Sequence, residues 1–226
     1  MKLIYHGKTK DVYLLEDGKV QLRFKDDMTG KDGVFDPGEN QVGLTVAGMG
    51  SLNLRVSERL FRLLEAQGIP THYVSSDPEQ ATMVVQNCAP FGQGLEVIHR
   101  NYAVGAFLRR YGLYAQEMQP LDDYVEFTLK DDERQDPLIT EDGLVQLGLL
   151  TRDEYRVLYD LTVRIAQLLT QTLADLGLTL IDIKFEYGRT PEGEIVLMDE
   201  LSAGNMRVYR DGEKLGPEAI SQAILG

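Results

Sequence analysis

Three charged side chains in the last fifth of the chain have the types and the spacing that phosphate chemistry requires. Lys184 and Glu186 lie two residues apart in the segment LIDIKFEYG, and Asp199 ends the apolar run 195–198. Successive side chains alternate across a strand, so Lys184 and Glu186 would share one strand face. Two carboxylates and one ammonium group within reach of each other can hold a hard divalent cation and the phosphates that it bridges.

A hairpin would bring these three residues together on one face. The segment 188–193 contains glycine and proline in a pattern typical of a turn, and predicted strands over 180–187 and 195–198 flank it. Solvated strand faces also carry alternating charges, and on that alternative Lys184 and Glu186 are ordinary surface residues. Asp199 and Glu200 favour a functional site, because a buried strand has no solvation reason to end in two carboxylates. The residue pattern alone leaves both alternatives open.

A second basic cluster lies near the N-terminus. Gly7, Lys8 and Lys10 lie in the segment GKTK between predicted strands over 2–5 and 11–15. Backbone N–H groups and two ammonium groups at such a junction can cover the phosphates of a nucleotide. The upstream glycine of a Walker A loop is missing, so an ordinary basic turn is the alternative.

The elements that must position these groups follow from periodicity. Asp17-Gly18 predicts a hairpin, and the alternation of Val20, Leu22 and Phe24 predicts that the chain opens with a small antiparallel sheet. Thr151 and Glu154 have capping-box spacing at the start of the longest predicted helix. Helices are predicted over 51–67, 103–111 and 151–176, with a short one from Pro217. Further strands are predicted over 71–74, 81–86, 95–100 and 125–129.

Two segments lack periodicity. The segment 25–50 contains six glycines, and a stretch of this length without periodicity is typical of a functional lid or a mobile segment. The segment 87–94 is a break, which we interpret as a hinge between a first lobe, 1–88, and a second lobe, 89–226.

Two arginines are candidates for anion binding. Arg100 lies just before the predicted helix 103–111, and helix N-termini attract anions, so it is well placed for a carboxylate or a phosphate. Arg207 follows the acids at 199 and 200, and it is either a substrate clamp or their ion-pair partner. The three histidines share no ligand spacing, so we assign them no metal and no catalysis.

The composition excludes several function classes. The chain has 226 residues, of which 43% are hydrophobic, which is enough for one large domain or two lobes. A net charge of −13 makes nucleic acid or an anionic membrane an unfavourable partner, although a small anionic ligand needs only a local basic pocket. No apolar run approaches the roughly 20 residues of a spanning helix, and the N-terminus becomes charged too early for a signal peptide. The single cysteine, Cys88, forms no internal disulfide and fits a reducing cytosol, so we expect a cytoplasmic protein.

Seven segments, taken in order, resemble the SAICAR synthetase family, the phosphoribosylaminoimidazole-succinocarboxamide synthases. They are YHGKTKDVY, FKDD, LEAQGIPTHYV, HRN followed by AVGAFLRRYG, VEFTLKDDERQDPLI, LIDIKFEYG, and VLMDELS with Arg207. Each segment alone is weak evidence, but seven in one order are highly specific. The resemblance covers nearly the whole chain, from Tyr5 to about Asp211.

This resemblance implies both a fold and a reaction. The fold is α+β and two-lobed, with a kinase-like or ATP-grasp-like nucleotide cleft. The cleft would lie between an antiparallel-sheet N-terminal lobe, 1–88, that covers the nucleotide and a larger α/β C-terminal lobe, 89–226, that binds metal and substrate. The implied activity is ATP-dependent amide formation in de novo purine synthesis. Its substrates are ATP, L-aspartate and carboxy-aminoimidazole ribonucleotide (CAIR), and its products are SAICAR, ADP and phosphate.

The resemblance also implies roles for individual residues. The metal ligands for Mg²⁺ are Glu186 and Asp199. The groups that bind the nucleotide are Gly7, Lys8, Lys10, Lys184, Glu186 and Asp199. The groups that bind the other substrates are Arg100, Asp136, Ser202 and Arg207. Lys184, Asp199 and Arg207 act in catalysis, and the backbone near Cys88 to Phe91 holds adenine.

The chain departs from the family pattern at several positions, mostly in the substrate half. Ala106 stands where the family commonly has serine, and Gly204 where it has the aspartate of an SPD segment. Met49-Gly50 and Asn53-Leu54 replace a lysine-glycine pair and paired asparagines. A divergent branch with the same reaction is favoured over a paralogue that joins another carboxylate to another amine. A nucleotide-binding protein without ligase activity and a phosphotransferase with a stable phosphorylated product are further alternatives. The oligomeric state stays open, a homo-oligomer included.

Overall fold

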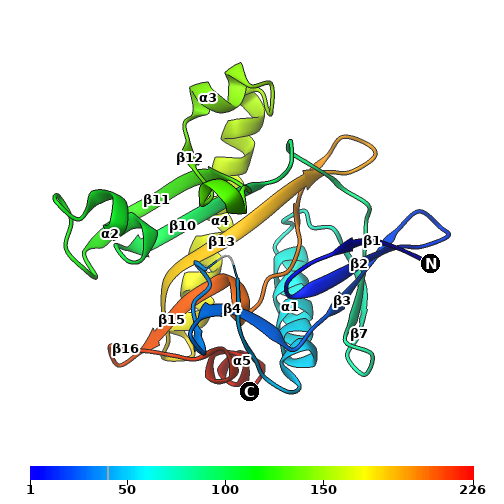
Figure 1. The fold of residues 1–226 in the computed structure, drawn as a ribbon, viewed down its shortest axis with the longest axis horizontal. Coiled ribbons are helices and arrows are strands. Elements are labelled where there is room, and N and C mark those ends of the chain that lie inside the picture. Colours follow the sequence, from blue (N-terminus) through cyan, green and yellow to red (C-terminus); the bar gives the residue numbers. More distant parts are fainter. Residues whose placement is uncertain (40) are drawn as a thin grey trace. The chain divides into compact units, whose positions relative to one another are not determined.

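The computed structural model describes residues 1–39 and 41–226, and these residues divide into two compact units. Unit 1 comprises Met1–Pro90, Tyr187–Asn205 and Gly216–Gly226, and unit 2 comprises Phe91–Glu186 and Met206–Leu215. Helices and antiparallel sheets occur in both units, which confirms the predicted α+β class (Figure 1). In the part of the chain that is described, no helix is both long and apolar enough to cross a membrane.

Unit 1 is built on a five-stranded antiparallel sheet in the order β1-β2-β3-β8-β7. Its strands are β1 (Lys2–His6), β2 (Lys10–Leu14), β3 (Val20–Phe24), β7 (Tyr73–Asp77) and β8 (Thr82–Val85). Along β3, Val20, Leu22 and Phe24 are buried and Arg23 is exposed, so the predicted alternation is confirmed.

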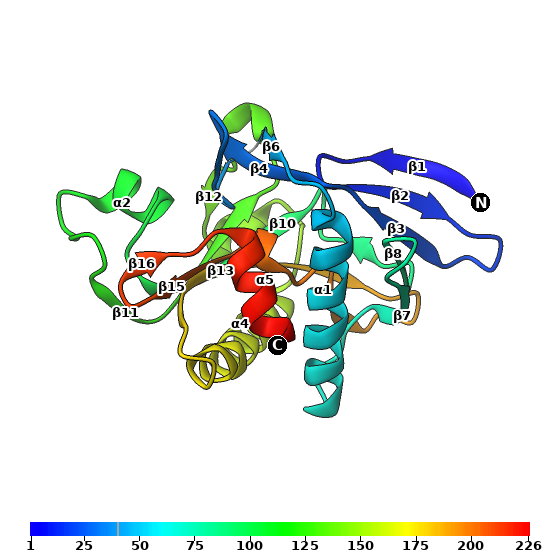
Figure 2. The same cartoon turned by 90° about the horizontal axis from the view of Figure 1, so that it is seen from below.

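Two helices complete the core of unit 1. Helix α1 (Met49–Ala66) packs against this sheet, and Phe61 of the helix stacks on Tyr73 with ring centroids 5.7 Å apart. Helix α5 (Pro217–Leu225) begins at its proline, as predicted, and lies beside α1 (Figure 2). The contact between them includes a hydrogen bond of 3.0 Å from Arg59 Nη1 to the carbonyl of Leu225.

The expected lack of regular structure over 25–50 is wrong, whereas the role of this segment as a lid or mobile element stays a prediction. This stretch forms a three-stranded antiparallel sheet, β5-β4-β6, from β4 (Asp27–Lys31), β5 (Val34–Phe35) and β6 (Val42–Thr45). Residue 40 lies outside the described residues. A Cβ added to Gly43 would meet the carbonyl carbon of Gly30 at 2.3 Å, so glycines here serve close backbone approach. The strands bury Met28 and Phe35 against Met49, and their short lengths conceal the alternation.

Unit 2 is built on an antiparallel sheet in the order β12-β11-β10-β13-β15-β16. Its strands are β10 (Leu95–Tyr102), β11 (Pro120–Leu129), β12 (Leu138–Ile139), β13 (Thr179–Arg189), β15 (Met206–Arg210) and β16 (Glu213–Lys214). Residues 179–186 of β13 belong to unit 2, and residues 187–189 belong to unit 1.

The long helix α4 (Arg152–Ala174) covers the apolar face of the unit 2 sheet (Figure 1). Phe127 of β11 stacks on Tyr155 of α4 with ring centroids 4.5 Å apart. The predicted capping box is present, because Thr151 accepts from the backbone of Glu154 and Glu154 accepts from the backbone of Thr151. Unit 2 also contains the short helices α2 (Ala106–Tyr111) and α3 (Glu141–Gln146) and the 3-10 turn η1 (Asp132–Arg134).

The predicted hairpin after β13 is confirmed in unit 1. A turn closed by a 2.8 Å hydrogen bond from Thr190 N to Glu194 O connects β13 to β14 (Ile195–Met198), and the two strands pair. The predicted break over 87–94 contains a two-residue strand, β9 (Ala89–Pro90), which pairs with Gly188 and Arg189. Leu197 of β14 also forms a parallel bridge with Thr71.

Candidate functional site

The predicted site residues divide between the two units. Unit 1 contains Gly7, Lys8, Lys10, Asp199 and Ser202. Unit 2 contains Arg100, Asp136, Lys184, Glu186 and Arg207. The predicted convergence of Lys184 and Glu186 with Asp199 involves residues of both units and stays a prediction. Each unit, taken by itself, gathers its charged residues into clusters.

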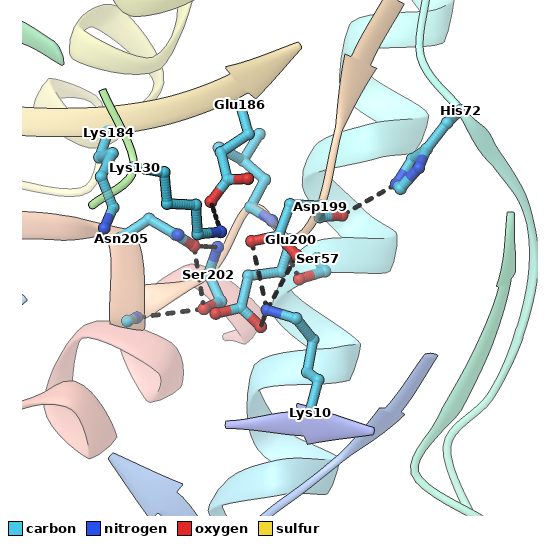
Figure 3. Close-up of polar contacts among 12 residues, drawn as sticks. Lys10, Ser57, His72, Lys130, Lys184, Glu186, Asp199, Glu200, Ser202 and Asn205 are labelled. Atoms are coloured by element: carbon cyan, nitrogen blue, oxygen red, sulfur yellow. Dashed lines mark hydrogen bonds and ion pairs between the residues drawn. The ribbon is translucent and has the colours of Figure 1, made fainter. Parts of the chain in front are cut away.

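In unit 1, one ammonium group contacts two consecutive carboxylates. Lys10 Nζ lies 3.1 Å from Asp199 Oδ1 and 2.8 Å from Glu200 Oε2 (Figure 3). Burial alone would lower the pKa of Lys10, but the charges of Asp199 and Glu200 outweigh it and hold this pKa above its usual value. Lys10 is therefore a fixed cation at neutral pH. The Asp199 side chain is 23% exposed, so its carboxylate also reaches solvent.

Asp199 has a backbone conformation that residues with side chains seldom adopt. Its φ is +67°, in the left-handed region. Its carbonyl oxygen lies 2.9 Å from His72 Nε2, and the ring of His72 is buried (Figure 3). Burial lowers the pKa of His72 to about 4, so the ring is neutral at pH 7.

The turn between β1 and β2 holds Gly7 and Lys8. The N–H of Gly7 donates to the carbonyl of Lys10 at 2.9 Å, and a Cβ at Gly7 would lie 2.7 Å from that oxygen. Only glycine fits this approach. Lys25 Nζ donates to the carbonyl of Gly7 at 2.7 Å and pairs with Asp11 at 2.7 Å, which anchors the turn from the next strand.

Ser202 lies in the turn that follows the acid pair. Its backbone N–H donates to Asn205 Oδ1 at 3.0 Å, and its hydroxyl accepts from the N–H of Gly204 at 3.1 Å. These bonds shape the 3-10 turn η2 (Ala203–Asn205). The predicted contact of Ser202 with substrate stays a prediction.

In unit 2, a second cluster contains two lysines, each of which pairs with an acidic side chain. Lys184 Nζ on β13 lies 2.6 Å from Glu96 Oε1 on β10, and Thr128 Oγ1 on β11 donates to the other oxygen of Glu96 at 3.1 Å. Lys130 Nζ lies 2.6 Å from Glu186 Oε1 (Figure 3). Burial lowers the pKa of Lys184, but the nearby charges of Glu96 and Glu186 outweigh it, so this pKa lies above its usual value.

Further along the same face, three arginines alternate with two acids. Arg100 donates from Nε and Nη2 to Glu126 Oε1, at 3.1 and 2.6 Å, and from Nη1 to Asp182 Oδ2 at 2.5 Å. Arg207 Nη1 contacts the same Asp182 oxygen at 2.6 Å, and Arg110 Nη2 contacts Glu126 Oε2 at 2.5 Å. We call these five residues the arginine network. Guanidinium groups held in fixed positions by buried carboxylates suit the recognition of an anionic ligand.

The strand register explains how the arginine network forms. Arg100 on β10 lies opposite Asp182 on β13, and Asp182 lies opposite Arg207 on β15. Directly opposed residues of antiparallel strands share a face, so the three side chains form one row. Gly105 lies against Arg207 of this row. Its φ is +53°, and a Cβ added to it would lie 3.0 Å from Arg207 Nη2.

Asp136 lies outside these clusters, in the polar loop that was predicted over 131–137. Its Oδ1 accepts from the N–H of Asp131 at 2.8 Å, and its φ is +47°. This hydrogen bond closes the loop on itself. The predicted role of Asp136 in substrate binding stays a prediction.

Each of the two predicted metal ligands, taken by itself, is a carboxylate, a ligand type that suits Mg²⁺. Among the described residues, no group of three or more histidine, cysteine or acidic side chains gathers as a metal cage. Mg²⁺ is commonly held by one or two carboxylates, with substrate phosphates and water as its other ligands. Each of these carboxylates also pairs with an ammonium group, Asp199 with Lys10 and Glu186 with Lys130.

Sequence reasoning missed the partners of the predicted residues. Glu96, Glu126 and Arg110 received no role, although each bonds a predicted residue or its partner. The sequence contained one signal for Glu96, because it is an acid on the same strand face as Arg100 in the predicted strand 95–100. Glu126 and Arg110 carry no comparable signal, because their partners depend on strand register.

Comparisons with known proteins give one consistent result. The family model described as SAICAR synthetase matches residues 3–221. The phosphoribosylaminoimidazole-succinocarboxamide synthase of Clostridium tetani is 53% identical over 226 residues, which is 100% of each chain. The corresponding synthase of Finegoldia magna is 36% identical over 100% of this chain and 94% of its own.

Solved structures agree with this result. A SAICAR synthetase (Type-2) in complex with ADP has a TM-score of 0.84 and 29% identity, and the match covers 97% of this chain and 93% of that one. The phosphoribosylaminoimidazole-succinocarboxamide synthase of Ehrlichia chaffeensis has a TM-score of 0.84 at 26% identity, covering 100% of this chain and 92% of that one.

Proposed function

This chain belongs to the SAICAR synthetase family, and we infer from that membership that it is an ATP-dependent ligase of purine biosynthesis. The observation that carries the inference is the 53% identity with the Clostridium tetani synthase over the full length of both chains. The proposed substrates are ATP, CAIR and L-aspartate, and the proposed products are SAICAR, ADP and phosphate.

The reaction requires activation of a carboxylate. The carboxylate of CAIR does not react with an amine at a useful rate, because oxide is a poor leaving group. A carboxylate oxygen attacks the γ-phosphorus of ATP, and ADP leaves. The aspartate amine then attacks the acyl carbon, loses a proton, and expels phosphate that carries one former carboxylate oxygen. Phosphoryl transfer of this kind asks the protein mainly for positioning and for neutralisation of charge.

Lysines of both units serve the nucleotide phosphates in this proposal. Gly7 and Lys8 lie in the turn that would cover the phosphates. The backbone of Gly7 approaches the carbonyl oxygen of Lys10 closely, which supports a fixed backbone conformation in this turn. Lys10 stays charged beside Asp199 and Glu200, and Lys184 stays charged beside Glu96. Each ammonium group is thus held as a cation before the nucleotide arrives.

Asp199 and Glu186 would hold Mg²⁺. The metal would neutralise negative charge on the phosphate oxygens that it bridges. The partial exposure of the Asp199 carboxylate supports this assignment. The negative charge of Asp199 is paired with Lys10, and that of Glu186 is paired with Lys130.

The arginine network would hold the anionic ribonucleotide. The guanidinium groups of Arg100 and Arg207 are buried and are held in place by carboxylates, which supports these two residues as binding groups. Arg207 also acts in catalysis in this proposal, together with Lys184 and Asp199. Asp136 and Ser202 complete the proposed substrate contacts.

The division of labour between lobes is also a proposal. Residues 1–88 would cover the nucleotide, residues 89–226 would bind metal and substrate, and the backbone of 88–91 would hold adenine. The exposure of Ala89 and Pro90 supports the last assignment. A cytoplasmic location is supported by the single cysteine, which fits a reducing compartment.

An ADP-release assay that omits each substrate in turn tests the proposed function. We expect ADP formation only when Mg-ATP, CAIR and L-aspartate are all present, and a product heavier than CAIR by an aspartyl group. ADP without an amide would indicate a phosphotransferase instead. Nucleotide binding without turnover would indicate a paralogue with another acid or amine, and a screen of carboxylates and amines would follow.

A further inference from the structure

Asp199 and Glu200 are consecutive residues, yet both carboxylates contact Lys10 Nζ. Successive side chains of an extended strand point to opposite faces. An extended continuation of β14 would therefore present only one of these acids to Lys10. The left-handed conformation of Asp199, φ +67°, breaks the alternation and turns both acids toward the same ammonium group.

His72 contacts the end of β14 at two points. Its backbone N–H donates to the carbonyl of Leu197 at 2.9 Å, and its ring Nε2 lies 2.9 Å from the carbonyl oxygen of Asp199. A carbonyl oxygen only accepts, so Nε2 carries the hydrogen of this bond. The two contacts fix Leu197, two residues before the left-handed position, and Asp199 at that position (Figure 3).

The ring of His72 is itself held in place. Its residue is 2% exposed, and the ring lies against Phe61 of α1 with centroids 5.6 Å apart. The carbonyl of His72 accepts from the N–H of Gln86 at 2.8 Å, and Leu197 donates back to the carbonyl of Pro70 at 3.1 Å. Because the ring of His72 is buried and the backbone on both sides of the contact is hydrogen-bonded, His72 is a rigid donor.

We propose that His72 is a positioning residue of the ligase, whose Nε2–H holds Asp199 in the left-handed conformation that aims the Asp199 carboxylate. The proposal rests on the proposed function, which assigns Asp199 to the nucleotide's Mg²⁺. His72 itself touches neither substrate nor metal. Without its hydrogen bond, Asp199 relaxes toward the extended conformation, and its carboxylate leaves the position beside Lys10 and Glu200.

A matched pair of variants isolates the hydrogen bond. Glutamine and methionine have similar length and shape, but only glutamine carries an N–H donor near the position of Nε2. His72→Gln and His72→Met therefore differ mainly in that donor. Isothermal titration of ADP, with and without Mg²⁺, measures metal-dependent binding independently of turnover.

We expect Mg²⁺ to strengthen ADP binding in the wild type and in His72→Gln. In His72→Met this gain falls by about fivefold, the factor that a hydrogen bond of typical net strength represents. ADP binding without metal stays within about twofold in all three proteins. A general loss of structure would instead weaken both arms of the titration.

Three results of the titration would overturn the proposal. If His72→Met keeps the full metal-dependent gain, the proposal fails while the metal assignment of Asp199 stands. If Mg²⁺ does not strengthen ADP binding to the wild type, the proposal for His72 and the metal assignment of Asp199 both fail. Equal losses in His72→Gln and His72→Met would also overturn it, because the donor would then be irrelevant.

A measurement on the unmodified protein avoids dependence on a variant's folding. The chain has three histidines, so the ring ¹⁵N signals of the labelled protein form a small set. We expect the neutral tautomer of His72 with hydrogen on Nε2 at pH 7. Hydrogen on Nδ1 with a bare Nε2 would rule out the bond to Asp199 and overturn the proposal.

Discussion

Replacement of Glu126 by glutamine removes one charge from the arginine network and preserves the side-chain shape. The carboxylate of Glu126 is 1% exposed, and it accepts from Arg100 and Arg110. The amide oxygen of glutamine can still accept from one guanidinium group, but its NH₂ group faces the other. Of the two carboxylates of the network, only Asp182 would then remain, and it contacts Arg100 and Arg207.

The magnitude follows from burial. Removal of one partner from a buried ion pair destabilises the fold by about 3–5 kcal/mol. Arg110 is 28% exposed, so water solvates it in part after the change. The retained amide oxygen also keeps one bond to Arg100. We therefore expect the free energy of unfolding to fall by about 3 kcal/mol, which lowers the Tm by about 6–12 °C in a chain of this length.

Urea unfolding followed by circular dichroism at pH 7 measures this change. Glu117→Gln is the matched control, because Glu117 is exposed in the same unit, and its free energy of unfolding should change by less than about 0.5 kcal/mol. Inorganic phosphate should stabilise Glu126→Gln more than the wild type, because the substitution removes one negative charge from the arginine network. A Glu126→Gln protein as stable as the wild type would refute the reasoning that this network is held together by buried charge.

Three other predictions concern single residues. Asp199→Asn should keep the circular dichroism spectrum and Tm of the wild type but lower kcat about 100-fold, as expected when about 2.7 kcal/mol of charge stabilisation is lost; near-normal turnover would exclude Asp199 as a metal ligand. Gly105→Ala should raise the KM for CAIR several-fold with a smaller change in kcat, because Gly105 has φ +53° and a Cβ there would lie against Arg207. Steady-state kinetics measures both constants, and an unchanged KM would contradict this prediction. Burial, and then the charge of Glu192, raise the pKa of Cys88 to about 11. Iodoacetamide should therefore label Cys88 about 20-fold more slowly than free cysteine at pH 8, with a rate that rises up to about pH 11; equal rates at pH 8 would contradict the raised pKa.

The parts of the fold with unbroken periodicity were predictable from sequence. The capping box at Thr151 and the hairpin after β13 depend on residues that are neighbours in the chain, and both are present. The sheet over 27–45 was not predictable, because its strands have two to five residues and contain glycines where backbones approach closely. Strands of this length are too short to display a period.

The shared strand face of two candidate site residues was predictable from the sequence, but the partners of these residues were not. Lys184 and Glu186 alternate with apolar neighbours, so their shared face is visible in sequence. Their partners Glu96 and Lys130 are 88 and 56 residues away in the chain, and only the strand register brings them close. His72 is a single buried histidine without ligand spacing, and its contact with Asp199 depends on the parallel bridge between Thr71 and Leu197.

The most direct test of the central claim follows oxygen from the substrate carboxylate. CAIR labelled with ¹⁸O in its carboxylate would be incubated with the enzyme, Mg-ATP and L-aspartate, and phosphate and amide would be analysed by mass. Carboxylate activation by ATP predicts one ¹⁸O in the released phosphate for each SAICAR formed. Unlabelled phosphate, or labelled phosphate without the amide, would contradict the assignment of this chain as a ligase that joins aspartate to an ATP-activated carboxylate.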